Sequence, residues 1–374
     1  MARSKTTTTK WVVPCYFSQE NFRTTPILFD LTAHLKLMLK NEVWERKYNY
    51  GFNTGLKNTD PTHIRKATIK IYPRFFSGIV NEKRISEFVG EECGNIPTWF
   101  DVDSYKKWSY QIGLAIIETE YDQSVKMPSK ANLTARFPNY DVDFIGIYHQ
   151  HLAVLKELSA FFLAVLHLSF PTHSIIIRTE NPLNDGFVQM RCGRQIYCAK
   201  VATNNFMHEI LIETSKKSNI EVNLNGVASV WHFDLWPLKR YLNAVESDQI
   251  SMDNLLDLIY SLEGLYGKNT SSDFVKISCM VMMCNTRKDA RKLKALLDLA
   301  YRIRNDIAHG ERSYDTYDYV TLDGKEILAQ TVYWEMKTVV ACMLIKAISK
   351  LIKNEDMRNL RFNTDDFINL SFKA

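Results

Sequence analysis

The residues best suited to chemistry in this sequence lie in one short segment, Arg304-Asn305-Asp306-Ile307-Ala308-His309. Apolar residues in and before this segment recur at three- and four-residue steps, which predicts a helix. Asn305 and His309 are four residues apart and would share one face of that helix, whereas Arg304 would reach the same region only through its long side chain. The three side chains could therefore converge on one phosphate group.

An arginine and a histidine at one phosphate group suit the cleavage of RNA. The guanidinium of Arg304 supplies a fixed positive charge and several donors for phosphate oxygens. The imidazole of His309 can transfer protons near neutral pH, and the partly negative end of a helix suits a general acid or a phosphate-binding cation there. Attack on phosphate by a ribose 2′-hydroxyl needs no metal or cofactor. The spacing alone leaves an alternative open, in which His309 only caps the helix and Arg304 lies on a solvated face.

Positively charged residues gather immediately before this segment. Seven basic residues and two acidic ones lie between positions 287 and 304. Because phosphate contacts dominate the affinity of proteins for nucleic acids, we expect part of this run to bind RNA. The expected contacts are Arg287, Lys288, Arg291, Lys292 and Arg302. A solvated helix face is the alternative, since runs of charge often have no other role.

Four helices are predicted to position these residues. Their expected bounds are about 251–267, 272–284, 285–310 and 329–352. Ser251 is the expected N-cap of the first helix, and Gly310 follows the third, as glycine does at helix ends. The second is apolar nearly all round, so it should be central. Four helices with apolar stripes indicate a bundle.

The third helix and its surroundings resemble a HEPN domain. The stretch from Leu297 to Gly310, LDLAYRIRNDIAHG, is similar to the HEPN signature helix, in which an arginine, a polar residue and a histidine after four intervening positions form the motif. Residues 261–265, SLEGL, and the apolar second helix resemble the Apea-like subgroup in particular. The resemblance covers residues 250–352, under a third of the chain.

The resemblance implies an RNA-cleaving enzyme. Proteins similar to this family are often metal-independent endoribonucleases that act as toxins or in abortive-infection defence against phage, with sites formed where two protomers meet. Carried over here, this implies Arg304 and His309 as catalytic residues, Asn305 as a supporting polar residue, and a homodimer that pairs two third helices. Glu263 is a weaker candidate for orienting Arg304, with an exposed helix carboxylate as the alternative. In HEPN toxins that a nucleotidyltransferase partner silences, a tyrosine follows the motif. Here Gly310 and Glu311 follow His309, so this tyrosine is absent at that spacing and such a partner is not expected.

The rest of the chain predicts an α+β fold with a mixed N-terminal region. The expected domains are a mixed α/β region over 1–245, a HEPN-like four-helix bundle over 250–352, and a C-terminal tail over 353–374. Helices are predicted over 31–40 and 144–168, and strands over 67–72, 174–178, 186–190 and 220–224. We expect the N-terminal region to sense a phage-derived or nucleotide trigger, or to recruit the substrate.

Composition indicates a folded cytoplasmic protein. Hydrophobic residues make up 46% of the chain and charged residues 24%, and the net charge is +5. Seven cysteines without a C-x-x-C pair argue against a disulfide framework or a zinc site. The start, with four threonines after Lys5, lacks the apolar core of a signal peptide and predicts a flexible tail. Polar residues interrupt the apolar stretch 152–170, which favours a buried helix over a membrane span.

Weaker features and rival functions complete the prediction. Two-residue pairs of aspartates and the pair His149 and His151 are expected to be structural, with no metal site. Tyrosines in the insert 311–326 could stack on bases, with an ordinary hairpin or loop as the alternative. Two rival functions stay open. One is a non-catalytic HEPN dimerisation or RNA-binding subunit of a defence complex, and the other is a helical protein with an incidental Arg/His pair.

Overall fold

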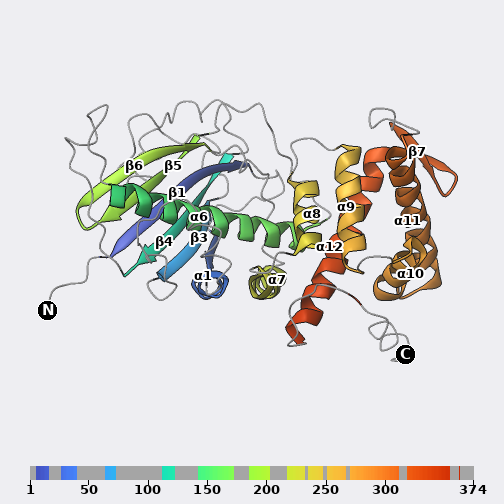
Figure 1. Ribbon diagram of the computed structural model, residues 1–374, viewed down its shortest axis with the longest axis horizontal. Coiled ribbons are helices and arrows are strands. Elements are labelled where there is room, and N and C mark those ends of the chain that lie inside the picture. Colours follow the sequence, from blue (N-terminus) through green and yellow to red (C-terminus); the bar gives the residue numbers. More distant parts are fainter. Residues whose placement is uncertain are drawn as a thin grey trace. The chain divides into compact units, whose positions relative to one another are not determined.

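The computed structural model describes residues 6–16, 27–39, 64–72, 112–122, 142–171, 185–202, 217–231, 235–246, 251–266, 270–310, 318–353 and 362. The chain divides into two compact units. The first comprises Met1–Leu163 and Arg178–Ser215, and the second comprises Ala164–Ile177 and Lys216–Ala374. Helices and a sheet both occur, which confirms the α+β class (Figure 1). The second unit takes in more of the chain than the bundle predicted over 250–352.

The first unit is built on a six-stranded antiparallel sheet with the strand order β2-β3-β4-β1-β5-β6. Its strands are β1 (Thr7–Tyr16), β2 (Ile27–Asp30), β3 (Ile64–Tyr72), β4 (Ile112–Tyr121), β5 (Asp185–Cys192) and β6 (Gln195–Ala202). β1 lies inside the sheet, between β4 and β5. The prediction of a flexible threonine tail is therefore wrong from Thr7 onward. Thr7 and Thr9 are fully buried, as β-branched side chains in a strand can be.

The described residues of this unit also include the helices α1 (Thr32–Leu39) and the long α6 (Val142–Ser169). The ring of Phe162 on α6 lies 4.9 Å from the ring of Phe29 on β2, so α6 packs on the sheet. The part of α6 from Ile147 to Ser169 is long and apolar enough to cross a membrane, but 67% of its most apolar window is buried inside the protein. Such burial favours the core helix of a soluble protein. The cytoplasmic location stays a prediction.

A buried histidine joins α6 to the central strands. His151 stacks on Tyr121 of β4 with ring centroids 4.0 Å apart, and its Nδ1 lies 3.0 Å from the Thr9 hydroxyl of β1. His149, two residues earlier, is exposed. The two histidines thus diverge, as expected for a helix. Burial lowers the pKa of His151 to about 3, so this side chain is neutral in the folded protein at physiological pH.

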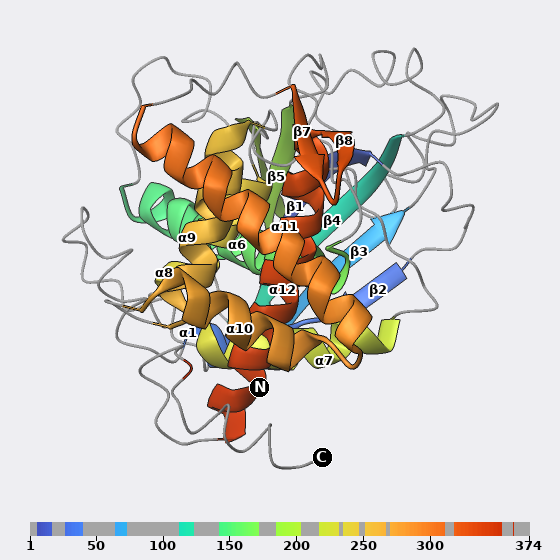
Figure 2. The same cartoon turned by 90° about the vertical axis from the view of Figure 1, so that its right-hand side faces the viewer.

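Within its described residues, the second unit consists of helices and one hairpin. Its elements are α7 (Lys217–Val230), α8 (Trp236–Val245), α9 (Met252–Gly264), α10 (Ser272–Met283), α11 (Arg287–Ala308), the strands β7 (Tyr319–Leu322) and β8 (Lys325–Leu328), and α12 (Ala329–Lys353). The four helices predicted after position 251 are all present, and α10, α11, α12 and the hairpin are seen together in Figure 2. Ser251 forms the N-terminal cap of α9 with Asn254, whose Oδ1 accepts from the Ser251 backbone at 2.7 Å.

Two buried hydrogen bonds link α6 to α8 and α8 to α12 within the second unit. The Tyr241 hydroxyl on α8 donates to the His167 carbonyl at the end of α6, and the Tyr333 hydroxyl on α12 donates to the Ala244 carbonyl, both at 3.0 Å. α8 also packs closely on α9. A side chain at Gly264 would place its Cβ only 2.6 Å from the Trp236 ring. The absence of a side chain at Gly264 therefore allows the two helices to approach.

Several local predictions differ from the structure. Residues 220–224, predicted as a strand, belong to helix α7, in which Ile220, Leu224 and Val227 are buried at helical spacing and Val222 is 69% exposed. The helix α10 is not central, because Ile277 and Val281 are exposed on it. Although α10 is apolar nearly all round, only one of its faces is packed against the protein.

Further predictions differ from the structure at the ends of elements or fall on residues that it does not describe. The helix α9 ends at Gly264, earlier than predicted. In the predicted tail, Phe362 is buried and its backbone N–H donates to the Leu265 carbonyl at 2.7 Å. The hairpin β7–β8 occupies part of the insert 311–326. The predicted strand 174–178, the paired aspartates, and Tyr314 and Tyr317 lie outside the described residues or side chains.

Acidification should weaken the first unit through His151. The folded protein holds this imidazole neutral with a pKa of about 3, whereas an unfolded chain would bind a proton near pH 6.5. Stability from the neutral form is complete above pH 6.5 and is lost as the pH falls toward 3. Between pH 6.5 and 5 we expect a loss of about 1–2 kcal/mol that is missing in His151→Gln, as measured by denaturant unfolding. An equal loss in His151→Gln and in the wild type would contradict this origin, and His149→Gln, at an exposed position of the same helix, is the control.

Candidate active site on helix α11

Helix α11 carries the segment from Arg304 to His309 at its C-terminal end. The helix begins at the N-cap Thr286, whose hydroxyl accepts from the Asp289 backbone at 3.1 Å. It ends with His309 as the C-cap and Gly310 at a positive φ of 70°. This left-handed conformation favours glycine and stops the helix. The predicted start near Thr286 and the predicted end at Gly310 are thus confirmed.

One side of α11 is buried, which fixes how the helix is rotated about its axis. The buried residues are Leu296, Leu297, Leu299, Ala300, Tyr301 and Ile303. They face the other helices of the unit, since α11 packs against α9, α10 and α12. The polar residues at the remaining positions are left on the outside, and the orientation of each functional side chain follows from this rotation.

Arg304 lies at the edge of the buried side, against α9. Its guanidinium Nη2 is 3.8 Å from Glu263 Oε2, and its carbon Cζ is 5.8 Å from the centre of the Tyr260 ring. Its Nη1 donates to Asn305 Oδ1 at 3.0 Å. The side chains of Arg304 and Glu263 are 30% and 31% exposed, so this pair is accessible from solvent. The Glu263 carboxylate therefore lies within ion-pair distance of Arg304, and its role in orienting that side chain stays a prediction.

The surroundings of Glu263 are partly apolar. Burial raises the pKa of Glu263, and the nearby Arg304 guanidinium acts in the opposite direction. Burial also raises the pKa of Tyr301, and the Glu263 carboxylate adds to that effect. Tyr260 and Tyr301 were not among the predicted site residues. The spacing of Tyr260 three positions before Glu263, on the same face of a helix, is the signal that could have found it.

Asn305 and His309 lie on the solvent side of α11. Both are exposed, and the His309 backbone N–H donates to the Asn305 carbonyl at 2.9 Å, so the two residues sit one turn apart. At about 100° per residue, the side chains of Arg304 and His309 leave the helix roughly 140° apart. The structure joins Arg304 to Asn305 by a hydrogen bond, and His309 lies next to Asn305 on the exposed face.

The predicted RNA-binding residues are all exposed on α11. Arg287, Arg291 and Arg302 fall on the same outward stripe as Asn305 and His309. Arg287 starts the helix, and 17 positions separate it from Arg304, or about 25 Å at 1.5 Å per residue. The basic run therefore precedes the site in sequence but extends away from it in space. Arg302 is the member of the predicted set that lies close to the site.

Two lysines of this region are engaged by one carboxylate. Asp298 on α11 binds Lys276 of α10 at 2.8 Å and Lys294 of its own helix at 2.5 Å. Partial burial acts in the opposite direction, but these two hydrogen bonds lower the pKa of Asp298. This carboxylate joins α10 to α11 and neutralises part of the basic run.

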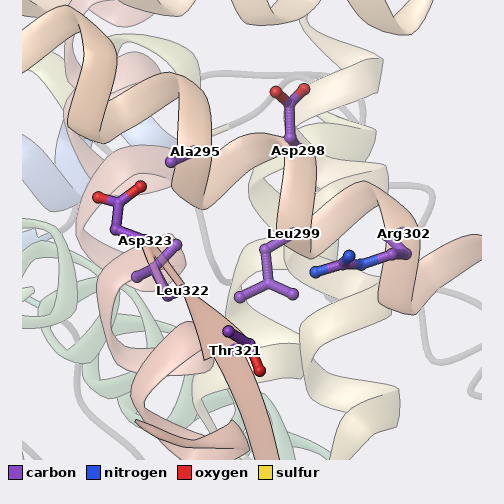
Figure 3. A pocket seen from close by; sticks show the side chains of 7 residues that line it. All are labelled: Ala295, Asp298, Leu299, Arg302, Thr321, Leu322 and Asp323. Atoms are coloured by element: carbon purple, nitrogen blue, oxygen red, sulfur yellow. The ribbon is translucent and has the colours of Figure 1, made fainter. Parts of the chain in front are cut away.

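A cleft opens between α11 and the β7–β8 hairpin (Figure 3). Its volume is about 370 Å³. The lining residues are Ala295, Asp298, Leu299, Arg302, Thr321, Leu322 and Asp323. Leu299 lines it from the helix and Leu322 from the hairpin, and in Figure 3 the Arg302 side chain extends toward Leu299. No local sequence pattern predicts this cleft, because its two walls come from elements separated along the chain.

Metal binding and the comparison with known proteins complete the description of the site. Among the residues that the structure describes, no group of three or more histidine, cysteine, aspartate or glutamate side chains is placed to hold a metal ion. Comparison of the chain with protein-family models, curated proteins and solved structures gives no match. The resemblance to HEPN domains therefore stays a proposal.

The ion pair between Arg304 and Glu263 should contribute little to stability. Its atoms are 3.8 Å apart and nearly a third exposed, and such pairs are worth about 0–1 kcal/mol. Arg240 and Asp257, 2.7 Å apart in the same unit, form a tighter control pair. We expect the double-mutant cycle of Glu263→Gln with Arg304→Gln to give a smaller coupling energy than the cycle of Asp257→Asn with Arg240→Gln. A larger coupling at Glu263 would mean that Arg304 is held more firmly than its contacts indicate.

Proposed function

We propose that this protein is a HEPN-type endoribonuclease that cleaves RNA without a metal ion, using Arg304 and His309. The observation that carries the proposal is the placement of these residues at the end of α11. Arg304 is held half-exposed by Glu263 and Asn305, and the exposed His309 lies one turn beyond Asn305. A fixed cation, a polar side chain and a proton-transferring group thus share one accessible helix end, beside an outward stripe of basic residues.

The chemistry assigns a role to each side chain. The ribose 2′-oxygen forms a bond to phosphorus while the bond from phosphorus to the 5′-oxygen breaks, which leaves a 2′,3′-cyclic phosphate and a 5′-hydroxyl. The Arg304 guanidinium stabilises the negative charge that develops on the phosphate oxygens. His309 moves a proton, either from the attacking hydroxyl or to the leaving oxygen. Asn305 positions Arg304 through the hydrogen bond to Nη1.

A second copy of the chain would complete this site. The in-line reaction uses one group that accepts a proton and another that donates one, and His309 supplies a single imidazole. Pairing of two α11 helices would bring a second His309 to the same phosphate. The outward faces of α11 are both basic, so two copies repel each other there unless an anion lies between them. RNA is such an anion, which supports a homodimer that closes on its substrate.

The first unit is a separate compact body and a candidate for regulation. We propose that it senses the trigger, phage-derived or nucleotide, or recruits the RNA, and that the protein acts in abortive-infection or toxin-type defence in the cytoplasm. The alternative function is a non-catalytic HEPN dimerisation or RNA-binding subunit. One observation favours it, because the Arg304 and His309 side chains leave the helix in different directions and no hydrogen bond joins them within the described residues.

Substitution of either proposed catalytic residue should abolish RNA cleavage. In a chelator-containing buffer, His309→Ala should lower the cleavage rate by about 10²–10⁴-fold, because proton transfer is lost. Arg304→Ala should lower the rate by about 10²–10³-fold, and Arg304→Lys by less, because a charge remains without the donor fork. The exposed residues His149 and Arg194 of the first unit provide matched alanine controls. Equal cleavage by the wild type and both variants would exclude this site, and RNA binding without cleavage by the wild type would favour the non-catalytic subunit.

The basic stripe should govern the salt dependence of RNA binding. With His309→Ala as the background, the logarithm of the affinity for single-stranded RNA should fall linearly with the logarithm of salt concentration. Each phosphate contact adds about 0.7 to the slope, so Arg287→Ala with Arg291→Ala should reduce it by about 1.4. Arg65→Ala with Lys66→Ala, at exposed positions of β3, should leave it unchanged. An unchanged slope in the α11 variant would indicate that the stripe is only a solvated face.

A further inference from the structure

The cleft between α11 and the β7–β8 hairpin combines apolar walls with polar groups at its rim. Leu299 from the helix and Leu322 from the strand supply its two walls, and Arg302 extends toward Leu299 from the helix (Figure 3). A flat aromatic group fits between two such apolar side chains, as extruded bases do in proteins that read them. The adjacent guanidinium can bind a phosphate attached to that group. The lining therefore suits a nucleotide.

The hairpin fixes one carboxylate at this cleft. Asp323 and Gly324 have φ angles of 50° and 75°, and they join Leu322 of β7 to its partner Lys325 of β8 as a tight two-residue turn. A turn with both central residues in the left-handed region matches the twist of the paired strands. Asp323 is therefore held in place by the backbone of the hairpin, even though it is exposed.

Of the two carboxylates that line the cleft, that of Asp323 forms no ion pair with the lysines or arginines of the described residues. Both oxygens of Asp298, the other acidic residue of the lining, are already bonded to Lys276 and Lys294. In Figure 3 the Asp298 carboxylate points away from Leu322. An ionised carboxylate only accepts hydrogen bonds and can accept two side by side. Among the bases, guanine offers two neighbouring donors on one edge, its ring N–H and its 2-amino group.

We propose that this cleft binds a guanine base of single-stranded RNA. The base lies between Leu299 and Leu322, its donor edge meets Asp323, and its phosphate meets Arg302. Arg302 and His309 share the outward face of α11, seven positions or about 10 Å apart. The bound base thus belongs to a nucleotide near the one that is cleaved. The inference rests on the proposed function for its substrate class, and it adds a base preference to that site.

The test measures binding, so that it does not depend on cleavage. Full-length His309→Ala is titrated with fluorescent five-nucleotide RNAs made of uridines with guanosine, inosine or adenosine at the centre. We expect guanosine to bind about tenfold more tightly than the other two, because a bidentate contact discriminates to about that extent and inosine lacks the 2-amino donor. Asp323→Asn should bring guanosine to the level of adenosine. Asp318→Asn, at an exposed carboxylate before β7, should leave the preference intact.

The outcomes separate this inference from the proposed function. Equal binding of the three RNAs, the absence of RNA binding, or a guanosine preference that survives Asp323→Asn would each overturn the guanine site. Because inosine alters the ligand alone, the test does not depend on the folding of a variant. A guanosine preference in a protein whose wild type cleaves no RNA would support the guanine site and refute the nuclease. Cleavage by the wild type without a base preference would support the nuclease and refute the guanine site.

Discussion

The burial of one side of α11 determines the arrangement of the whole candidate site. Leu297, Ala300 and Ile303 are at most 1% exposed and lock the helix against the rest of its unit. With that rotation fixed, Arg304 must lie at the edge of α9 while Asn305 and His309 face solvent. A change of one helical position would turn the helix by about 100° and place charged side chains in the core, at a cost of several kcal/mol for each. Packing in the core thus sets the geometry at the surface.

The contacts of Arg304 restrict its side chain and still leave it accessible to solvent. Glu263 and Tyr260 approach the guanidinium from α9, and Asn305 approaches it from α11 itself. Each contact is individually weak, because the ion pair is half-open to water and the ring lies nearly 6 Å away. Such a side chain keeps donors for a phosphate while its position stays restricted. In the proposed function, preorganisation of this kind would lower the entropy lost when Arg304 binds a phosphate group.

The parts of the fold that could be predicted from the sequence depend on local signals. The ends of α11 follow from a capping threonine and a glycine with positive φ, and both act within one turn of the chain. The position of β1 could not be predicted, because its threonines resemble a polar tail until β4 and β5 pair with them. The strand predicted over 220–224 failed since five residues cannot distinguish a period of two from the helical period. Leu299 and Leu322 line the cleft from opposite walls, and no local pattern predicts that two positions so far apart in the chain come together.

The interleaving of the two units has an evolutionary consequence. A chain segment of the first unit, Arg178–Ser215, is inserted between two segments of the second, Ala164–Ile177 and Lys216–Ala374. Recombination at one point of the gene cannot separate such units, and a cut between Ser215 and Lys216 would divide the second unit and remove the bond from Tyr241 to the His167 carbonyl. The helical unit could therefore not have been exchanged between genes as a simple C-terminal cassette. A single crossover therefore either transfers both units together or breaks one of them.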